Sequence, residues 1–149
     1  MSDKSLSRVD VAASTFAEGF NCAQAVFSAY AVEAGIERET ALRIAGAFGA
    51  GIASRGELCG AVSGACMAIG LKYGKVQAED NAAREKTYGL VREFMRRFEE
   101  KHGSIVCKDL IQFDVSDPEQ YQAARQANVF KNQCPNFVND AAVILEELL

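Results

Sequence analysis

The sequence predicts an all-α fold, a single-domain bundle of about six to eight helices. Apolar residues recur at helical spacing along the chain, whereas the alternating β-branched runs typical of strands are nearly absent. Glycine, proline and capping residues fall between the periodic segments, where helices start and stop. A chain of 149 residues is long enough for one sizeable core, so we interpret residues 1–149 as one all-helical domain.

The first half of the chain contains four expected helices. They cover approximately residues 4–18, 22–34, 37–47 and 57–70, the last extending to 74 if Gly70 does not end it. Asn21 is the expected N-cap of the second, and Gln24 completes a capping box with it. A glycine-rich turn follows the third helix.

The fourth helix is unusually rich in small residues. Glycine costs a helix about 1 kcal/mol relative to alanine, yet glycines recur at helical spacing in this segment, at Gly60, Gly64 and Gly70. We infer that a neighbouring backbone or a bound group approaches this helix closely.

The second half contains four more helices, at approximately residues 77–101, 104–113, 117–131 and 134–149. Asp117 followed by Pro118 is a strong start signal, because proline is favoured in the first helical position. Cys134 precedes Pro135 in the same way, and Ser104 is the expected cap of the short helix.

Composition and charge exclude several classes of function. The net charge of −4 argues against non-specific binding to nucleic acid or to an anionic membrane surface. The longest apolar stretch is too short to span a bilayer, and the polar N-terminus does not resemble a signal peptide. We therefore expect a cytoplasmic protein that has neither nucleic-acid nor membrane partners.

Four of the five cysteines fall in the first turn of an expected helix: Cys22, Cys59, Cys107 and Cys134. The helix N-terminus stabilises a thiolate there, so we expect the pKa of these thiols to be lowered. Thiolates serve both redox chemistry and metal ligation, whereas buried inert cysteine is the alternative. No two cysteines form a CxxC motif, so a shared site has to be assembled by the tertiary structure.

The remaining candidates are weaker. Cys66 stands about two helical turns, or roughly 10 Å, beyond Cys59. His102, the only histidine, suits a cation at the end of the long helix. No residue set indicates general acid–base chemistry, so the sequence leaves open whether the protein is an enzyme.

Three segments resemble a known family. The run GFNCAQAV at residues 19–26, the run CGAVSG at residues 59–64, and Cys107 with Cys134 are similar to the redox-active proteins named for their C, GCAxxG, C, C cysteine pattern. The resemblance covers nearly the whole chain and implies a joint role for the four cysteines, with Cys66 as an addition. A similar domain accompanies some multihaem cytochromes, in which an iron–sulfur site is suspected. The haem part is not carried over, since this chain has no CxxCH.

Three hypotheses follow. In the first, Cys22, Cys59, Cys107 and Cys134 are redox thiols that converge on an iron–sulfur cluster or another thiolate-bound metal, for electron transfer or redox sensing. Gly60 and Gly64 then give the cofactor room. In the second, the cysteines perform metal-free thiol–disulfide chemistry. In the third, the chain is a non-enzymatic helical interaction module with structural cysteines. A redox partner protein and a second copy of the chain, packed on the small-residue helix, are the expected partners.

Overall fold

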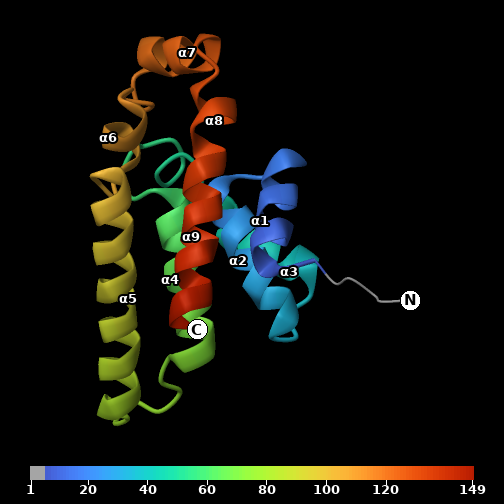
Figure 1. The fold of residues 1–149 in the computed structure, drawn as a ribbon, viewed down its shortest axis with the longest axis vertical. Helices are drawn as coiled ribbons and strands as arrows, with labels where there is room; N and C mark the ends of the chain where they lie inside the picture. Colours follow the sequence, from blue (N-terminus) through green and yellow to red (C-terminus); the bar gives the residue numbers. More distant parts are fainter. Residues whose placement is uncertain (1–5) are drawn as a thin grey trace.

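The structure, a computed structural model, describes residues 6–149 and confirms the all-α prediction (Figure 1). Those residues form no strand. The helices are α1 (Arg8–Ala17), α2 (Cys22–Glu33), α3 (Arg38–Ala45), the 3-10 turn η1 (Gly46–Phe48), α4 (Gly60–Tyr73), α5 (Asn81–His102), α6 (Cys107–Ile111), α7 (Pro118–Gln126), α8 (Val129–Asn132) and α9 (Cys134–Leu148). Within the described residues, no helix combines the length and the apolar character needed to cross a bilayer.

The core lies where α2, α4, α5 and α9 meet. Helix α9 contacts α1, α2, α4 and α5, and Figure 1 shows it between α5 and the α1–α2 pair. The largest fully buried side chains come from these helices, among them Ile69 of α4, Phe94 and Phe98 of α5, and Leu145 of α9. The burial of these apolar faces is the main stabilising contribution to the bundle.

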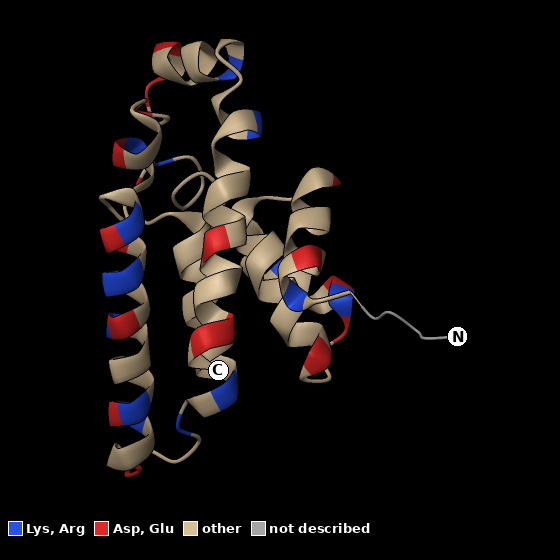
Figure 2. Cartoon of the chain, in the orientation of Figure 1, with Lys and Arg blue, Asp and Glu red and all other residues tan. Residues whose placement is uncertain are grey.

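Charged residues gather on the outer helix α5, whereas α4 and the start of α9 carry few (Figure 2). Glu93 pairs with Arg97 at 2.7 Å, an i,i+4 ion pair on the surface of α5. Arg84 lies over the Tyr88 ring in the same helix, 4.8 Å from its centroid. Such exposed pairs contribute little stability but keep this face in water.

Local capping signals correctly locate several helix starts. Asn21 and Gln24 form the expected capping box at α2, with hydrogen bonds of 2.8 and 3.0 Å. Asp117 accepts a hydrogen bond from the backbone N–H of Gln120 and so caps α7. The first helix begins at Arg8 with Ser7 as its cap, and the expected start at Lys4 lies outside the described residues.

Two expected helices differ from the structure. The segment 117–131 is broken into α7 and α8 because Asn128 adopts a left-handed conformation, with φ of 56°. Asparagine is among the few non-glycine residues that tolerate this region. The short helix begins at Cys107 rather than near Ser104. The Ser104 hydroxyl accepts a hydrogen bond from the Val106 N–H instead of capping the helix.

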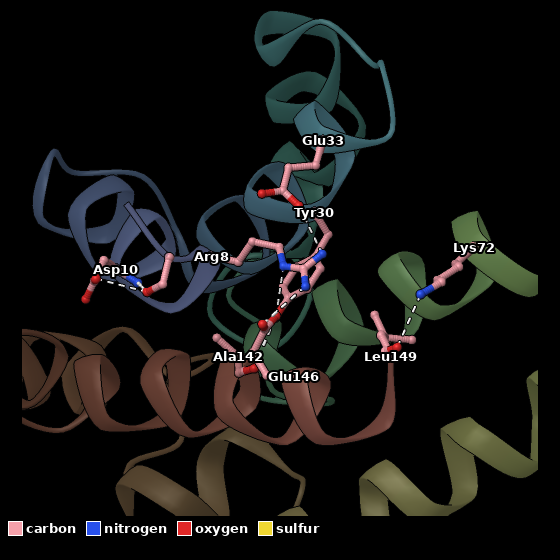
Figure 3. Close-up of polar contacts among 9 residues, drawn as sticks. Arg8, Asp10, Tyr30, Glu33, Lys72, Ala142, Glu146 and Leu149 are labelled. Atoms are coloured by element: carbon pink, nitrogen blue, oxygen red, sulfur yellow. Dashed lines mark hydrogen bonds and ion pairs between the residues drawn. The ribbon is translucent and has the colours of Figure 1, made fainter. Parts of the chain in front are cut away.

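Helices α1, α2 and α9 are joined by one polar network (Figure 3). The Tyr30 hydroxyl of α2 donates to the Glu146 carboxylate of α9 at 2.8 Å, and Arg8 of α1 lies 2.8 Å from the same carboxylate. Arg8 also pairs with Glu33 at 3.0 Å. The network joins the C-terminal part of α9 to α1 and to the C-terminal part of α2.

Candidate functional site

The four family cysteines all stand at helix starts. Cys22, Cys107 and Cys134 are the first residues of α2, α6 and α9, and Cys59 is the N-cap residue of α4. Cys22 is half-buried and the other three are buried. All four line one cavity, which brings together segments that are far apart in the sequence.

A short antiparallel bridge brings Cys59 beside Cys107. Leu58 pairs with Val106, the Cys59 N–H donates to the Ile105 carbonyl at 2.8 Å, and the Cys107 N–H donates to the Glu57 carbonyl at 2.6 Å. These hydrogen bonds fasten the start of α4 to the start of α6.

Two glycines lie close to the side chains of Cys22 and Cys107, where a Cβ atom would be crowded. A Cβ at Gly60 would lie 3.1 Å from the Cβ of Cys22, and one at Gly51 would lie 2.8 Å from the Cβ of Cys107. Gly51 has φ of 70°, within a left-handed turn that also includes Ala50 and Ile52. Non-glycine residues in this region cost about 1–3 kcal/mol each, and such strain is concentrated at functional sites.

Gly64, expected to give room to a cofactor, lies outside the cavity lining. A Cβ there would lie 2.8 Å from the Ala23 carbonyl oxygen and 3.3 Å from the Cβ of Val26. Its missing side chain allows α2 and α4 to pack closely. Of the two glycines assigned to the cofactor, only Gly60 lies in the cavity wall.

Cys22 and Cys134 form a hydrogen-bonded pair of thiols. The hydrogen bond from Cys22 lowers the pKa of Cys134, against the opposing effect of burial. The same hydrogen bond raises the pKa of Cys22 well above its ordinary value, and burial adds to this shift. Cys134 is therefore the more readily ionised thiol of the pair.

At the remaining two thiols, burial is the dominant influence on the pKa. It raises the pKa of Cys59 from 9.0 to about 11, although the N–H groups of Ala61 and Val62 favour the thiolate. Burial also raises the pKa of Cys107 to about 12, with smaller contributions from Cys59 and Cys134. The expectation that helix starts lower the pKa of all four thiols was wrong for Cys22, Cys59 and Cys107. At Cys22 the hydrogen bond with Cys134 and then burial raise the pKa, whereas at Cys59 and Cys107 desolvation is the largest cause.

The cavity extends well beyond the four thiol groups. It has a volume of about 740 Å³ and extends from the cysteines between α1, α6, α7 and α8. Its wall is mostly apolar and contains five aromatic side chains: Phe16, Phe20, Tyr121, Phe130 and Phe137. Arg125 and Lys131 are the charged residues in the lining.

A single metal ion does not fit this arrangement. Among residues 6–149, no group of three or more histidine, cysteine, aspartate or glutamate side chains is close enough together to hold one ion. The four thiols instead spread along the wall of a cavity, and every pair of them interacts electrostatically.

Cys66 and His102 lie apart from the cavity lining. Cys66 is half-buried within α4, where burial raises its pKa to about 11. His102 lies 2.8 Å from Asp140 and packs between Phe98 and Phe137, 4.7 and 5.0 Å between ring centroids.

Sequence reasoning missed several residues of the cavity. It also missed the bridge beside the cavity. The Ile105 carbonyl accepts the Cys59 N–H, and the pair of β-branched residues Ile105 and Val106 was the available signal for this bridge. The aromatic residues and the two cations are distributed over α1, α7, α8, α9 and the segment after α1, so no single local pattern marks them.

The family comparison matches most of the chain. The model of the family described as "Putative redox-active protein (C_GCAxxG_C_C)" matches residues 20–148, which include all four cavity cysteines. No curated protein and no solved structure matches the chain.

Proposed function

The chain belongs to the C_GCAxxG_C_C family of redox-active proteins, and from this premise we propose that Cys22, Cys59, Cys107 and Cys134 hold an iron–sulfur cluster. The observation that supports the proposal is the position of four family cysteines, from four separate helix starts, along one cavity. When bound, such a cluster accepts and releases an electron.

The chemistry of the donors fits a cluster. Four thiolates in one buried site repel one another, and here neighbouring cysteines contribute to the raised pKa values of Cys22, Cys59 and Cys107. The four cysteines would ligate an iron core as thiolates, and its positive charge would compensate theirs. A cluster of several atoms accepts ligands that are spread around it, whereas one ion needs its sulfur donors at about 2.3 Å from a single point. The Ala61 and Val62 N–H groups near the Cys59 sulfur would tune the cluster potential.

Anaerobic purification tests the proposal directly. We expect the full chain, isolated anaerobically or reconstituted with iron and sulfide, to contain both elements and to absorb visible light. Cys107→Ala should reduce the iron content strongly, whereas Cys66→Ala, the matched control, should not. Colourless wild-type protein that remains free of iron after reconstitution would contradict the proposal.

A second candidate function is metal-free dithiol–disulfide chemistry of Cys22 and Cys134. Their hydrogen bond specifically favours it, because a thiolate beside a thiol is the arrangement from which a disulfide forms. Oxidation would join the two sulfurs, release two electrons to an oxidant and free the thiol proton of Cys22. Mild oxidation of metal-free protein should then remove thiols in a pair, and Cys22→Ser should abolish the loss. An unchanged thiol count rejects this candidate.

Either chemistry requires an electron donor or acceptor, so the proposal includes a redox partner protein. A reducing compartment such as the cytoplasm suits the unpaired thiols. A homodimer formed through α4 remains part of the proposal, tested by measuring the molecular mass in solution.

A further inference from the structure

The cavity beside the cysteines continues into an aromatic chamber with a positive rim. We propose that this chamber, lined by α1, α7 and α8, binds a planar aromatic acid. The ring of this organic anion lies among aromatic side chains, and its acidic group meets Arg125 and Lys131. A ring bound here would lie near the thiols and would be the small-molecule ligand of the proposed redox site. This redox role rests on the proposed function, whereas the binding of the ligand does not.

The aromatic lining indicates a flat ligand. Phe16 belongs to α1 and Phe20 follows it, while Tyr121 of α7 and Phe130 of α8 have ring centroids 5.8 Å apart. Ring faces and edges of this kind hold a planar aromatic molecule by stacked and edge contacts. Tyr121 and Phe130 are both half-buried, so their rings present apolar surface to the cavity.

The charge of the lining indicates an anion. Arg125 and Lys131 line the cavity, and no carboxylate does. Neither cation forms an ion pair with any described residue. The Arg125 guanidinium lies 6.0 Å from the centroid of the Tyr121 ring, which places a cation beside the aromatic wall. Since the whole chain has a net charge of −4, this positive rim is not a general property of the surface.

The space suits a small organic molecule. Small-molecule sites typically measure about 300–1,000 Å³ and combine apolar walls with a few polar groups, and this cavity of about 740 Å³ falls in that range. Ala13 and Ala17, both exposed, are small residues of α1 that line the cavity on either side of Phe16 in the sequence. Figure 1 shows α7 and α8 at the end of the molecule beyond the start of α9. Residues of both helices line the cavity.

Calorimetric titration of the full chain with anthraquinone-2-sulfonate tests the inference. We expect saturable binding at least tenfold tighter than that of 10-methylacridinium, a planar cation with the same number of fused rings. Arg125→Glu combined with Lys131→Glu should weaken binding of the sulfonate at least tenfold. Arg92→Glu with Lys108→Glu, a double control on exposed cations outside the cavity lining, should change it less than twofold.

A second variant tests the location. Ala17→Trp fills the chamber from the exposed face of α1, so it should abolish binding while the circular dichroism spectrum remains that of the wild type. The inference is overturned if the wild type does not bind the sulfonate, if the acridinium binds equally well, or if the control double variant weakens binding as much as the test variant. Iron and sulfide are measured in the same sample. Protein that binds the sulfonate but contains no iron supports the ligand site and contradicts the iron–sulfur cluster. Protein that contains iron but does not bind the sulfonate supports the cluster and contradicts the ligand site.

Discussion

At the scale of single residues, hydrogen bonding and burial divide the four family cysteines into two kinds. The thiol of Cys22 lowers the pKa of Cys134, whereas burial raises the pKa of Cys59 and Cys107. In the metal-free protein, Cys134 is therefore the thiol most ready to react as a thiolate.

The first prediction concerns this reactive thiol. Cys22→Ala removes the hydrogen-bond donor and leaves burial to raise the pKa of Cys134. We expect iodoacetamide to alkylate Cys134 about tenfold more slowly at pH 7.5, because reactivity follows the thiolate fraction. Peptide mass spectrometry over a time course measures the rate. Cys66→Ala should leave the rate unchanged, and an equal rate in the Cys22→Ala variant would contradict the assigned hydrogen bond.

The sequence predicted where these cysteines stand but not how they ionise. Asn21 and Pro135 are local signals that place Cys22 and Cys134 at helix starts. The direction of each pKa depends on burial and on the approach of one thiol to another. Both are set by tertiary packing, so the expected lowering failed for three of the four thiols.

At the scale of elements, the close approach of α2 and α4 controls the site. Gly64 lies against the backbone of Ala23, the residue that follows Cys22. A side chain at Gly64 would push apart the two helices that begin near Cys22 and Cys59.

The second prediction compares two glycines of the same helix. Gly64→Ala should lower the free energy of unfolding by about 1–3 kcal/mol, because its methyl group would overlap the Ala23 carbonyl. Gly70→Ala should raise it by about 0.5–1 kcal/mol, since no atom lies within 4 Å of the added Cβ and alanine favours a helix. Urea unfolding measures both. Equal effects of the two substitutions would refute the close packing at Gly64.

Helix positions were predictable where a local signal exists and unpredictable where long-range contacts decide. Caps and prolines located the starts of α2 and α7. The break at Asn128 and the left-handed turn at residues 50–54 lack such signals. The turn includes Ile52, a β-branched residue that disfavours positive φ, and hydrogen bonds such as Ala53 N–H to the Ala47 carbonyl hold it in place.

At the scale of the whole molecule, the site exists only through the tertiary structure. The Leu58–Val106 bridge joins two of the helix starts, and the Arg8–Tyr30–Glu146 network positions α9 against α1 and α2. The sequence contains no CxxC motif that would indicate this assembly. Pattern and resemblance therefore selected the four cysteines, and only the fold shows that they share a cavity.

The third prediction is a loss of stability at alkaline pH. Cys59 and Cys107 have folded-state pKa values of about 11 and 12, against an ordinary value of 9.0. Between pH 9 and these values both thiols stay protonated in the folded protein, whereas they ionise in the unfolded chain. Their contribution to the free energy of unfolding is therefore fully present below pH 9 and is lost as the pH rises toward the folded-state pKa values. Each of the two thiols should lower the free energy of unfolding by about 1 kcal/mol between pH 8 and pH 10. Cys134, whose pKa is lowered, has an effect of opposite sign.

A variant that lacks one of these thiols measures its separate contribution to the unfolding of the metal-free protein. Cys59→Ala removes a titrating group, so the difference in unfolding free energy between pH 8 and pH 10 should shrink by about 1 kcal/mol. Gly70→Ala alters stability without removing a thiol and should leave this difference as large as in the wild type. If Cys59→Ala and wild type lose the same free energy between the two pH values, then Cys59 is not held as a buried neutral thiol.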